Sequence, residues 1–325
     1  MQSHPPGQPI RLELPFAIDR TTVNAYLFLE PEPVLIDTGD SSEEVWQALL
    51  AGLADHGVTP ADLSKVFITH IHIDHFGQAA RLARESEATF FVIEAGYEWL
   101  TNFRANWQVR RDYYKTTFLP AMGLSQTEQD QMVAYSQWVL ENYEGVPAPR
   151  VRPLRAGDAV TLGAASWQVL HLPGHASTQT CFYQPESRRL LSSDMLLART
   201  PTPVVEPSRA EEKGPRALPL FVQSLDRMRG LAIDCVYPGH GGPFDDADSV
   251  IERQLARIAR RKEECFGHVA AGVQTVAALV EKMYSPSRYV NMSAVWMVVG
   301  YLDLLENEGR VAMEAVDGVW RYRVR

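Results

Sequence analysis

The chain has 325 residues, of which 46% are hydrophobic and 22% are charged, a composition that fits a globular protein and excludes a disordered one. Its formal net charge of -9 does not favour general nucleic-acid binding, because an acidic protein repels the phosphate backbone. We find no membrane-length apolar run, no signal-peptide pattern at the N-terminus and three scattered cysteines without a disulfide framework, so we expect a cytoplasmic protein.

The first 93 residues predict alternating strands and helices. Short apolar runs separated by proline and polar turns indicate five strands. These strands are expected at 10–16, 23–29, 33–37, 65–69 and 89–93. Apolar residues at helical spacing predict two helices, at 42–56 and 77–85. Strands and helices in this order are typical of an α/β layered domain.

Residues 95–145 interrupt this pattern with several predicted helices that are rich in aromatic residues. We expect a helical insertion that packs over the functional cleft of the layered domain. Its aromatic rings would line an apolar substrate pocket, form the insertion's own small core, or make a dimer contact. Later elements are expected as strands within 158–171, 179–184, 189–193 and 234–237, a proline-rich ordered loop at 200–219 and a helix near 216–229.

The end of the chain differs in charge from the rest. Residues 250–325 hold eleven Lys or Arg and nine Asp or Glu, so this part is slightly basic while the remainder is acidic. Ser249 and Glu252 form a capping-box pattern that predicts the start of a helix. The expected elements are helices at about 249–266, 272–284 and 292–308 and strands at 310–313 and 319–324. This is the order of a winged helix, so we divide the chain into domains 1–248 and 249–325.

One short segment is dense in metal-ligand chemistry. Three histidines and one aspartate lie within six positions at the exit of a predicted strand: His70, His72, Asp74 and His75. Imidazole and carboxylate groups suit zinc, iron or manganese. Alternation along an extended chain places His70 and His72 on one side, and the turn that follows can direct the other two toward a second point. Packing these groups together without a metal would leave costly unsatisfied polar atoms.

Three later signals complete this pattern. His175 lies in a Pro-Gly-His turn, Asp194 ends a predicted strand, and His240 lies in a second Pro-Gly-His turn. All three follow predicted strands, and the C-terminal ends of strands are where α/β layers place their sites. A single Pro-Gly-His tripeptide only marks a turn. Both of them, in this order after the histidine-rich segment, predict a metal site.

These motifs resemble those of the metallo-β-lactamase-fold hydrolase superfamily. The matching segments are HIHIDH at 70–75, PGH at 173–175, SD at 193–194 and GH at 239–240. The resemblance extends over residues 10–245 and implies an α/β fold, a four-layer αβ/βα sandwich of two mixed sheets. Ala176 stands where many relatives have Thr, and Ser193 where many have Gly. Neither difference removes a ligand.

The resemblance also implies a binuclear site for divalent ions, with Zn²⁺ favoured over Fe or Mn. The first metal ion would be held by His70, His72 and His175. The second would be held by Asp74, His75 and His240, with Asp194 bridging the two. Asp37 matches an acidic position that supports a ligand without binding metal, and His171 is expected to be structural.

A binuclear site of this kind predicts hydrolysis by a hydroxide held between the metals, with Asp74 and Asp194 as catalytic groups that hold the pair and shuttle a proton. We expect a small-molecule or acyl substrate such as a thioester, lactone or ester. A single-strand-specific endoribonuclease or phosphodiesterase, and a mononuclear-iron persulfide-type dioxygenase, remain alternatives. A non-catalytic binding protein with a relic site is a further alternative, but the intact set of seven side chains argues against it.

Residues 249–325 resemble the winged-helix appendage of the lactamase-like endoribonuclease group. The third expected helix has no Lys or Arg between Arg288 and Arg310, which makes a poor phosphate-facing surface. We therefore favour a packing or homodimer module over a nucleic-acid-binding one. A basic stripe precedes it on the first helix, for which a solvated helix face is the ordinary interpretation. The stripe consists of Arg253, Arg257, Arg260 and Arg261.

Overall fold

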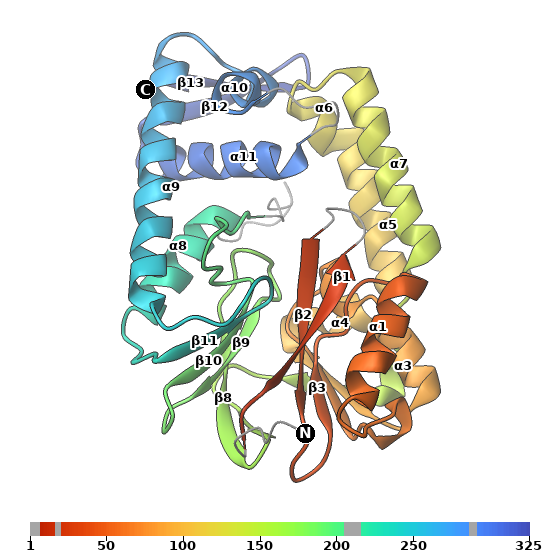
Figure 1. The fold of residues 1–325 in the computed structure, drawn as a ribbon. Coiled ribbons are helices and arrows are strands. Elements are labelled where there is room, and N and C mark those ends of the chain that lie inside the picture. Colours follow the sequence, from red (N-terminus) through yellow and green to blue (C-terminus); the bar gives the residue numbers. More distant parts are fainter. Residues whose placement is uncertain (1–6, 17–20, 205–215, 286–290) are drawn as a thin grey trace.

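Two β-sheets face each other in the lower part of the molecule (Figure 1). The computed structural model describes residues 7–16, 21–204, 216–285 and 291–325. The first sheet has the order β1-β2-β3-β4-β5-β6, antiparallel from β1 to β3 and parallel from β3 to β6. Its strands are β1 (Ile10–Phe16), β2 (Thr21–Phe28), β3 (Val34–Ile36), β4 (Lys65–Ile68), β5 (Thr89–Ile93) and β6 (Val151–Leu154).

The second sheet has the order β11-β10-β9-β8-β7, and only its β10–β11 pair is parallel. Its strands are β7 (Ala159–Leu162), β8 (Ala165–His171), β9 (Thr180–Gln184), β10 (Arg189–Ser193) and β11 (Cys235–Pro238). Side chains alternate between the faces of a strand. In β4, Phe67 therefore enters the core between the sheets, while Val66 and Ile68 pack under the helices on the outer face.

Helices cover the outer face of each sheet, which gives the expected four layers. The first sheet packs against α1 (Glu43–Ala54) and α3 (Ala79–Glu85), and the second against α8 (Ala217–Met228). The aromatic core between the sheets includes Phe28, Phe67 and Trp167. The predicted mixed α/β sandwich is confirmed.

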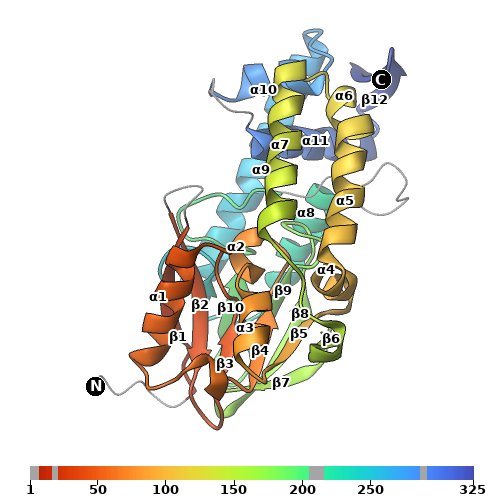
Figure 2. The same cartoon turned by 90° about the vertical axis from the view of Figure 1, so that its right-hand side faces the viewer.

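The helical insertion rises from the first sheet to the other end of the molecule (Figure 2). It contains α4 (Tyr97–Thr101), α5 (Phe103–Tyr113), a π-helical turn at Tyr114–Phe118, α6 (Leu119–Ala121) and α7 (Gln126–Asn142). At its base Phe103 packs on Phe76, with ring centroids 4.9 Å apart. At its tip Phe118 meets Trp320 edge to face. Many of the insertion's aromatic rings therefore join the two large outer cores rather than a separate one.

The C-terminal region contains three helices and a hairpin in the predicted order. They are α9 (Ala247–Ala270), α10 (Val276–Met283), α11 (Met292–Asn307), β12 (Val311–Val316) and β13 (Val319–Val324). The long α9 runs beside α8 up one side of the molecule, and α11 crosses from it toward the insertion (Figure 1). Most of α11 is buried, so its surface is used for packing within the chain. The winged-helix assignment and the domain boundary stay predictions.

Several local expectations differ from the structure. The strand β6 was not predicted, and Asp246 rather than Ser249 caps α9, because its carboxylate accepts the Ser249 amide. Residues 205–215 of the expected loop at 200–219 lie outside the described residues. Within the described part of the chain, no helix has both the length and the apolar character needed to cross a membrane.

Candidate metal centre

Seven predicted ligands converge at one edge of the sandwich, where loops follow the strands. His70 and His72 follow β4, and a short helix α2 (Ile73–Phe76) carries Asp74 and His75. The other three come from the second sheet. His175 lies between β8 and β9, Asp194 directly follows β10, and His240 follows β11. The structure thus brings together residues that are up to 170 positions apart in the sequence.

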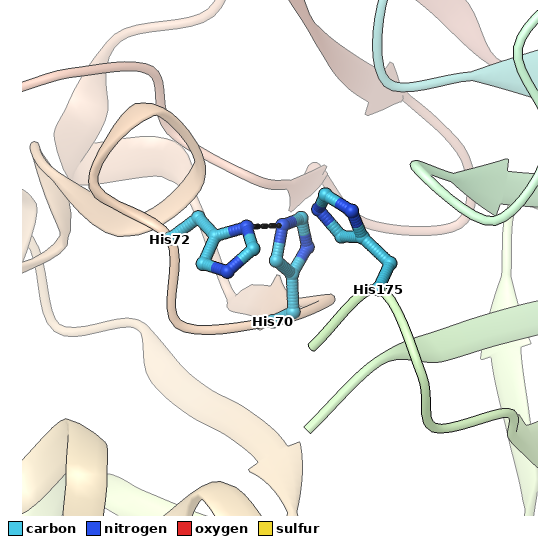
Figure 3. A group of neighbouring side chains, drawn as sticks. All are labelled: His70, His72 and His175. Carbon is cyan, nitrogen blue, oxygen red and sulfur yellow. Dashed lines mark hydrogen bonds between the residues drawn. The ribbon is translucent and has the colours of Figure 1, made fainter. Parts of the chain in front are cut away.

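The first group consists of His70, His72 and His175, whose potential ligand atoms lie within 4.8 Å of one another. In Figure 3 the three rings lie close together, and a hydrogen bond joins those of His70 and His72. The distance from His70 Nε2 to His72 Nδ1 is 3.0 Å. The rings of His72 and His175 have centroids 4.5 Å apart. These three residues are the predicted ligands of the first metal.

The second group consists of Asp74, His75 and His240. His240 Nε2 lies 3.3 Å from Asp74 Oδ2, and His75 Nε2 lies 3.8 Å from the same oxygen. His75 is fully buried, whereas the side chains of Asp74 and His240 are 13% and 22% exposed. The cluster is therefore more accessible at Asp74 and His240 than at His75.

Asp194 lies between the two groups. Its Oδ2 is 3.4 Å from His175 Nε2 and 3.4 Å from His240 Nε2. Its Oδ1 is 3.5 Å from His75 Nε2. One carboxylate thus reaches a histidine of the first group and two of the second. This is the placement expected for a residue that contacts both metal ions.

The donor set fits divalent metal ions. Imidazole nitrogens bind zinc at about 2.0–2.1 Å in tetrahedral geometry, so two ligand atoms of one ion are about 3.3 Å apart. The observed separations within the cluster are close to that value. His75 Nε2, His175 Nε2 and Asp194 Oδ1 are buried without a hydrogen-bond partner in the described structure. Such atoms are costly unless they are coordinated.

The cluster has a strong electrostatic preference for positive charge. Burial raises the pKa of Asp74, but the adjacent His75 and His240 more than offset this effect and lower it to about 2. The same balance holds the pKa of Asp194 well below its usual value. Burial lowers the pKa of His75, yet the surrounding carboxylates raise it to about 10. They raise that of His240 to about 11. Both aspartates are therefore ionised, as metal ligation requires.

In the first group, His70 and His175 have lowered rather than raised pKa values. Burial and the neighbouring histidines hold the pKa of His70 well below its usual value. Burial also lowers the pKa of His175, although Asp194 opposes it. These imidazoles are therefore neutral near pH 7, the form that donates a lone pair to a metal.

Asp37 supports His75, as the sequence predicted. His75 Nδ1 donates to Asp37 Oδ2 at 2.9 Å, and Thr69 donates to both oxygens from its amide and its hydroxyl at 2.8 Å. A partner of this kind fixes the ring and leaves Nε2 for a metal. Asp37 and Ser193 have φ values of 58° and 46°. Non-glycine residues rarely adopt that region, and such strain is concentrated at functional sites.

His240 is supported by two side chains that the sequence analysis missed. Asn24 Nδ2 donates to the carbonyls of Pro238 at 2.8 Å and Gly241 at 2.7 Å, and the Tyr26 hydroxyl donates to Pro238 at 2.7 Å. His240 Nδ1 donates to the carbonyl of Thr22 at 2.7 Å. The available signal was a buried asparagine within an otherwise apolar strand, since such a group needs partners.

Glycine is required beside His240 for steric reasons. A Cβ atom at Gly239 would lie 2.0 Å from Asp194 Oδ1 and 2.9 Å from His75 Cε1. The turn can therefore approach the cluster only with glycine at this position.

His175 and His171 have different roles in the loop that follows β8. His175 Nδ1 donates to the Pro203 carbonyl at 2.7 Å, which leaves its Nε2 facing Asp194. His171 Nε2 instead bonds the Ser177 carbonyl at 2.8 Å within the same loop. His171 therefore stabilises the loop, which agrees with the structural role expected for it.

Comparison with known proteins decides the family. The sequence model of the metallo-beta-lactamase superfamily matches residues 18–240. The chain belongs to this superfamily. It is 27% identical over 317 residues to "Probable metallo-hydrolase YqjP" of Bacillus subtilis (strain 168), covering 96% of this chain and 94% of that protein. These relatives and the histidine–aspartate cluster are consistent with a hydrolase.

Two solved structures share the whole fold. A metallo-beta-lactamase family protein from Thermus thermophilus superposes with a TM-score of 0.80 at 25% identity, covering 98% of each chain. A beta-lactamase domain protein from Burkholderia ambifaria gives a TM-score of 0.78 at 25% identity, covering 100% of this chain and 97% of that one. The insertion and the C-terminal region are therefore parts of a shared architecture.

A more distant relative is named as a thioesterase. The chain is 22% identical over 234 residues to "Atrochrysone carboxyl ACP thioesterase" of Aspergillus fumigatus. That alignment covers 72% of this chain but only 55% of the fungal protein. The likeness therefore covers only part of each protein.

Proposed function

We propose that this protein binds two divalent metal ions and hydrolyses an acyl substrate, namely a thioester, a lactone or an ester. The observation that carries the proposal is the pair of three-residue groups with Asp194 between them. His70, His72 and His175 would hold one ion. Asp74, His75 and His240 would hold the other. Ions bound by these residues would supply an activated water and would polarise the substrate carbonyl.

The chain's own residues explain how a substrate would be handled. The buried carboxylate of Asp194 fixes the separation of the two groups, and Asp37 keeps His75 in one orientation. Asp74 and His240 form the more accessible part of the cluster, so the substrate carbonyl would approach from that direction. Asp74 is then placed to accept the proton that the attacking water loses and to pass it to the leaving group.

One observation supports an acyl substrate, and another supports dependence on metal. A relative that aligns over 72% of this chain is named as a thioesterase. The buried cysteines Cys181 and Cys265 have pKa values raised by burial, so neither is suited to act as a thiolate nucleophile. Hydrolysis then depends on the metal cluster.

The test is a substrate panel with protein reconstituted with Zn²⁺. An acyl thioester, a lactone and single-stranded RNA are compared, with Asp194→Asn as the matched inactive variant. Thioester or lactone hydrolysis that requires metal and is lost in the variant supports the proposal. Cleavage of RNA without acyl hydrolysis contradicts the acyl substrate and supports the nuclease alternative.

Elemental analysis tests the metal content independently. We expect two zinc ions per chain in the wild type, because the two groups each offer three ligands. One iron per chain, with oxygen consumption in place of hydrolysis, would support the dioxygenase alternative.

A further inference from the structure

A second, positively charged cavity lies beside the segment that follows Asp194. It has a volume of about 370 Å³ and is bounded by residues 197–201 on one side and by α9 on the other. This is within the range of small-ligand pockets, which is about 300–1,000 Å³. Its charged lining consists of Arg199, Arg253, Arg257 and Arg260. None of the described residues that line it is acidic.

Helix geometry explains this concentration of charge. Positions 253, 257 and 260 are spaced by four and three residues, so they share one face of α9. Arg199 approaches the same cavity from the opposite wall. The fourth arginine of the predicted stripe, Arg261, points elsewhere: it contacts Glu264 and lies over the Tyr284 ring, 4.5 Å from its centroid. Three members of the stripe thus line a cavity, and among the described residues the fourth alone forms an ion pair with a carboxylate.

Nearby arginines that do not line the cavity form ion pairs with carboxylates. Around the same helix, Arg229 contacts Glu252 and Arg310 contacts Glu263. Within the described part of the chain, no carboxylate forms an ion pair with any of the four cavity arginines. Arg253 donates only to the Ser249 hydroxyl at 3.0 Å and to the Ala198 carbonyl at 3.1 Å. All four cavity arginines are solvent-exposed, and their clustered like charges repel one another, so a bound anion relieves this repulsion.

The wall of the cavity is directly connected to the metal centre. The segment that borders the cavity begins after Asp194 and runs to Pro203. The Pro203 carbonyl accepts a hydrogen bond from His175. Between these points, the buried Gln254 of α9 donates at 3.4 Å to the Met195 carbonyl and to the Thr202 hydroxyl. The same segment therefore borders both sites.

We propose that this cavity binds a phosphate-bearing ligand through Arg199, Arg253, Arg257 and Arg260. Guanidinium groups match phosphate oxygens with paired, charge-assisted hydrogen bonds. The phosphate belongs either to a thioester substrate whose acyl end reaches the metal centre or to a separate phosphorylated compound. The first source depends on the proposed function, but the anion site itself does not.

Binding of inorganic pyrophosphate tests the site. Calorimetry is performed on metal-loaded and on chelator-treated protein, because phosphate can also bind metal ions while the arginine site needs none. Arg257→Glu is compared with Arg321→Glu, an equal charge change on an exposed residue of β13 outside the cavity. Arg260→Glu serves as a second cavity variant, and circular dichroism verifies folding.

We expect binding to both wild-type preparations, at least ten-fold weaker binding in Arg257→Glu and Arg260→Glu, and unchanged binding in Arg321→Glu. No binding to chelator-treated wild type, or equal weakening by cavity and control variants, would overturn the proposal.

A kinetic experiment distinguishes the two sources of phosphate. Hydrolysis of an acyl-coenzyme A is compared with that of the same acyl group on N-acetylcysteamine, which has no phosphate. If the substrate carries the phosphate, Arg257→Glu raises KM about ten-fold for the first compound only and leaves kcat unchanged. If pyrophosphate binding is lost but KM is constant, the ligand is a separate compound. If neither thioester is hydrolysed, a thioester substrate is excluded from the proposed function while the binding experiment still decides the site.

Discussion

Two buried aspartates in different regions of the molecule show what makes the metal cluster distinctive. Asp194 lies at the strand ends and Asp303 lies in the C-terminal helix α11, and they are only 5% and 4% exposed. Burial alone raises the pKa of both carboxyl groups. The histidines around Asp194 reverse this effect, so its pKa falls well below its usual value. Asp303 contacts Arg216, which offsets only part of the burial effect, and its pKa rises to about 7.

The difference lies in the number of cationic partners. Asp194 lies within 3.5 Å of His75 and His240, whose pKa values are raised, whereas Asp303 shares its one arginine with Glu306. A buried negative charge is stable only where enough positive charge surrounds it. The cluster is therefore built to keep its carboxylates ionised and to attract cations. The C-terminal region instead accommodates a carboxyl group that is close to neutral.

The largest difference in activity is expected between two matched substitutions, Asp194→Asn and Asp303→Asn. Asp194→Asn removes the one carboxylate that reaches both metal groups, so we expect a loss of activity of about a thousand-fold or more and a fall in bound metal. Asp303→Asn should leave kcat within about two-fold, because this residue lies outside the cluster. Steady-state kinetics and elemental analysis measure both effects. A fully active Asp194→Asn protein would remove the basis of the comparison.

Residues that hold the proposed metal ligands in place should affect metal binding and activity less than the ligands themselves. Asp37→Asn keeps the shape of the side chain but removes the charge that orients His75. We expect a loss of about 10–100-fold in metal affinity or activity, as is usual for such partners. Because Asp37 orients only His75, which we assign to the second proposed ion, the affinity for that ion should fall more than the affinity for the other. Metal titration followed by dialysis measures this, and equal weakening of both ions would contradict the separation into two groups.

The seven side chains of the cluster could be picked out from sequence because they lie in short, recognisable motifs that come after strands. His175 and His240 lie in Pro-Gly-His turns, and His70 begins a run that needs only local alternation and a turn. The support of Asp37 followed from its place in the family pattern. The supporting roles of Asn24 and Tyr26 could not be predicted in this way, because their hydrogen-bond partners are backbone carbonyls more than 200 residues away.

The missed features outside the cluster also have physical causes. The strand β6 contains Pro153, which is compatible with a strand only at a sheet edge, and the edge position is a property of the assembled sheet. The helical spacing of Arg253, Arg257 and Arg260 was visible, but the cavity was not. It requires Arg199, which reaches the helix only through tertiary packing.

Loss of an uncharged side chain that supports the same cluster should reduce activity still less. Tyr26→Phe removes the hydroxyl that donates to the Pro238 carbonyl beside His240. One such hydrogen bond contributes about 1 kcal/mol, so we expect a loss of activity of about two- to ten-fold with a slightly lower melting temperature. Tyr183→Phe is the matched control, because Tyr183 donates to the Ala232 carbonyl at 2.8 Å away from the ligands. Equal losses of activity in both variants would show that the effect is not specific to His240.

The smallest expected effect concerns how protein stability depends on pH through Asp303 in the C-terminal region. The pKa of Asp303 rises from 3.8 to about 7 on folding, so the folded state holds this proton more tightly than the unfolded chain does. That stabilisation is fully present below about pH 4 and is lost as the pH rises through about 7. Asp303→Asn resembles the protonated form at every pH. Its melting temperature relative to the wild type should therefore increase between pH 5 and pH 8, by about 2–4 °C.

Differential scanning calorimetry measures this change, and metal loss at low pH cancels because both proteins carry the same cluster. Asp226→Asn provides the control, since Asp226 is an exposed residue that contacts Arg229, and its relative melting temperature should stay nearly constant over the same range. A flat or falling difference for Asp303→Asn would mean that Arg216 keeps Asp303 ionised, as the histidines do for Asp194. The two regions would then handle buried charge in the same way, and partner number would no longer explain the contrast between them.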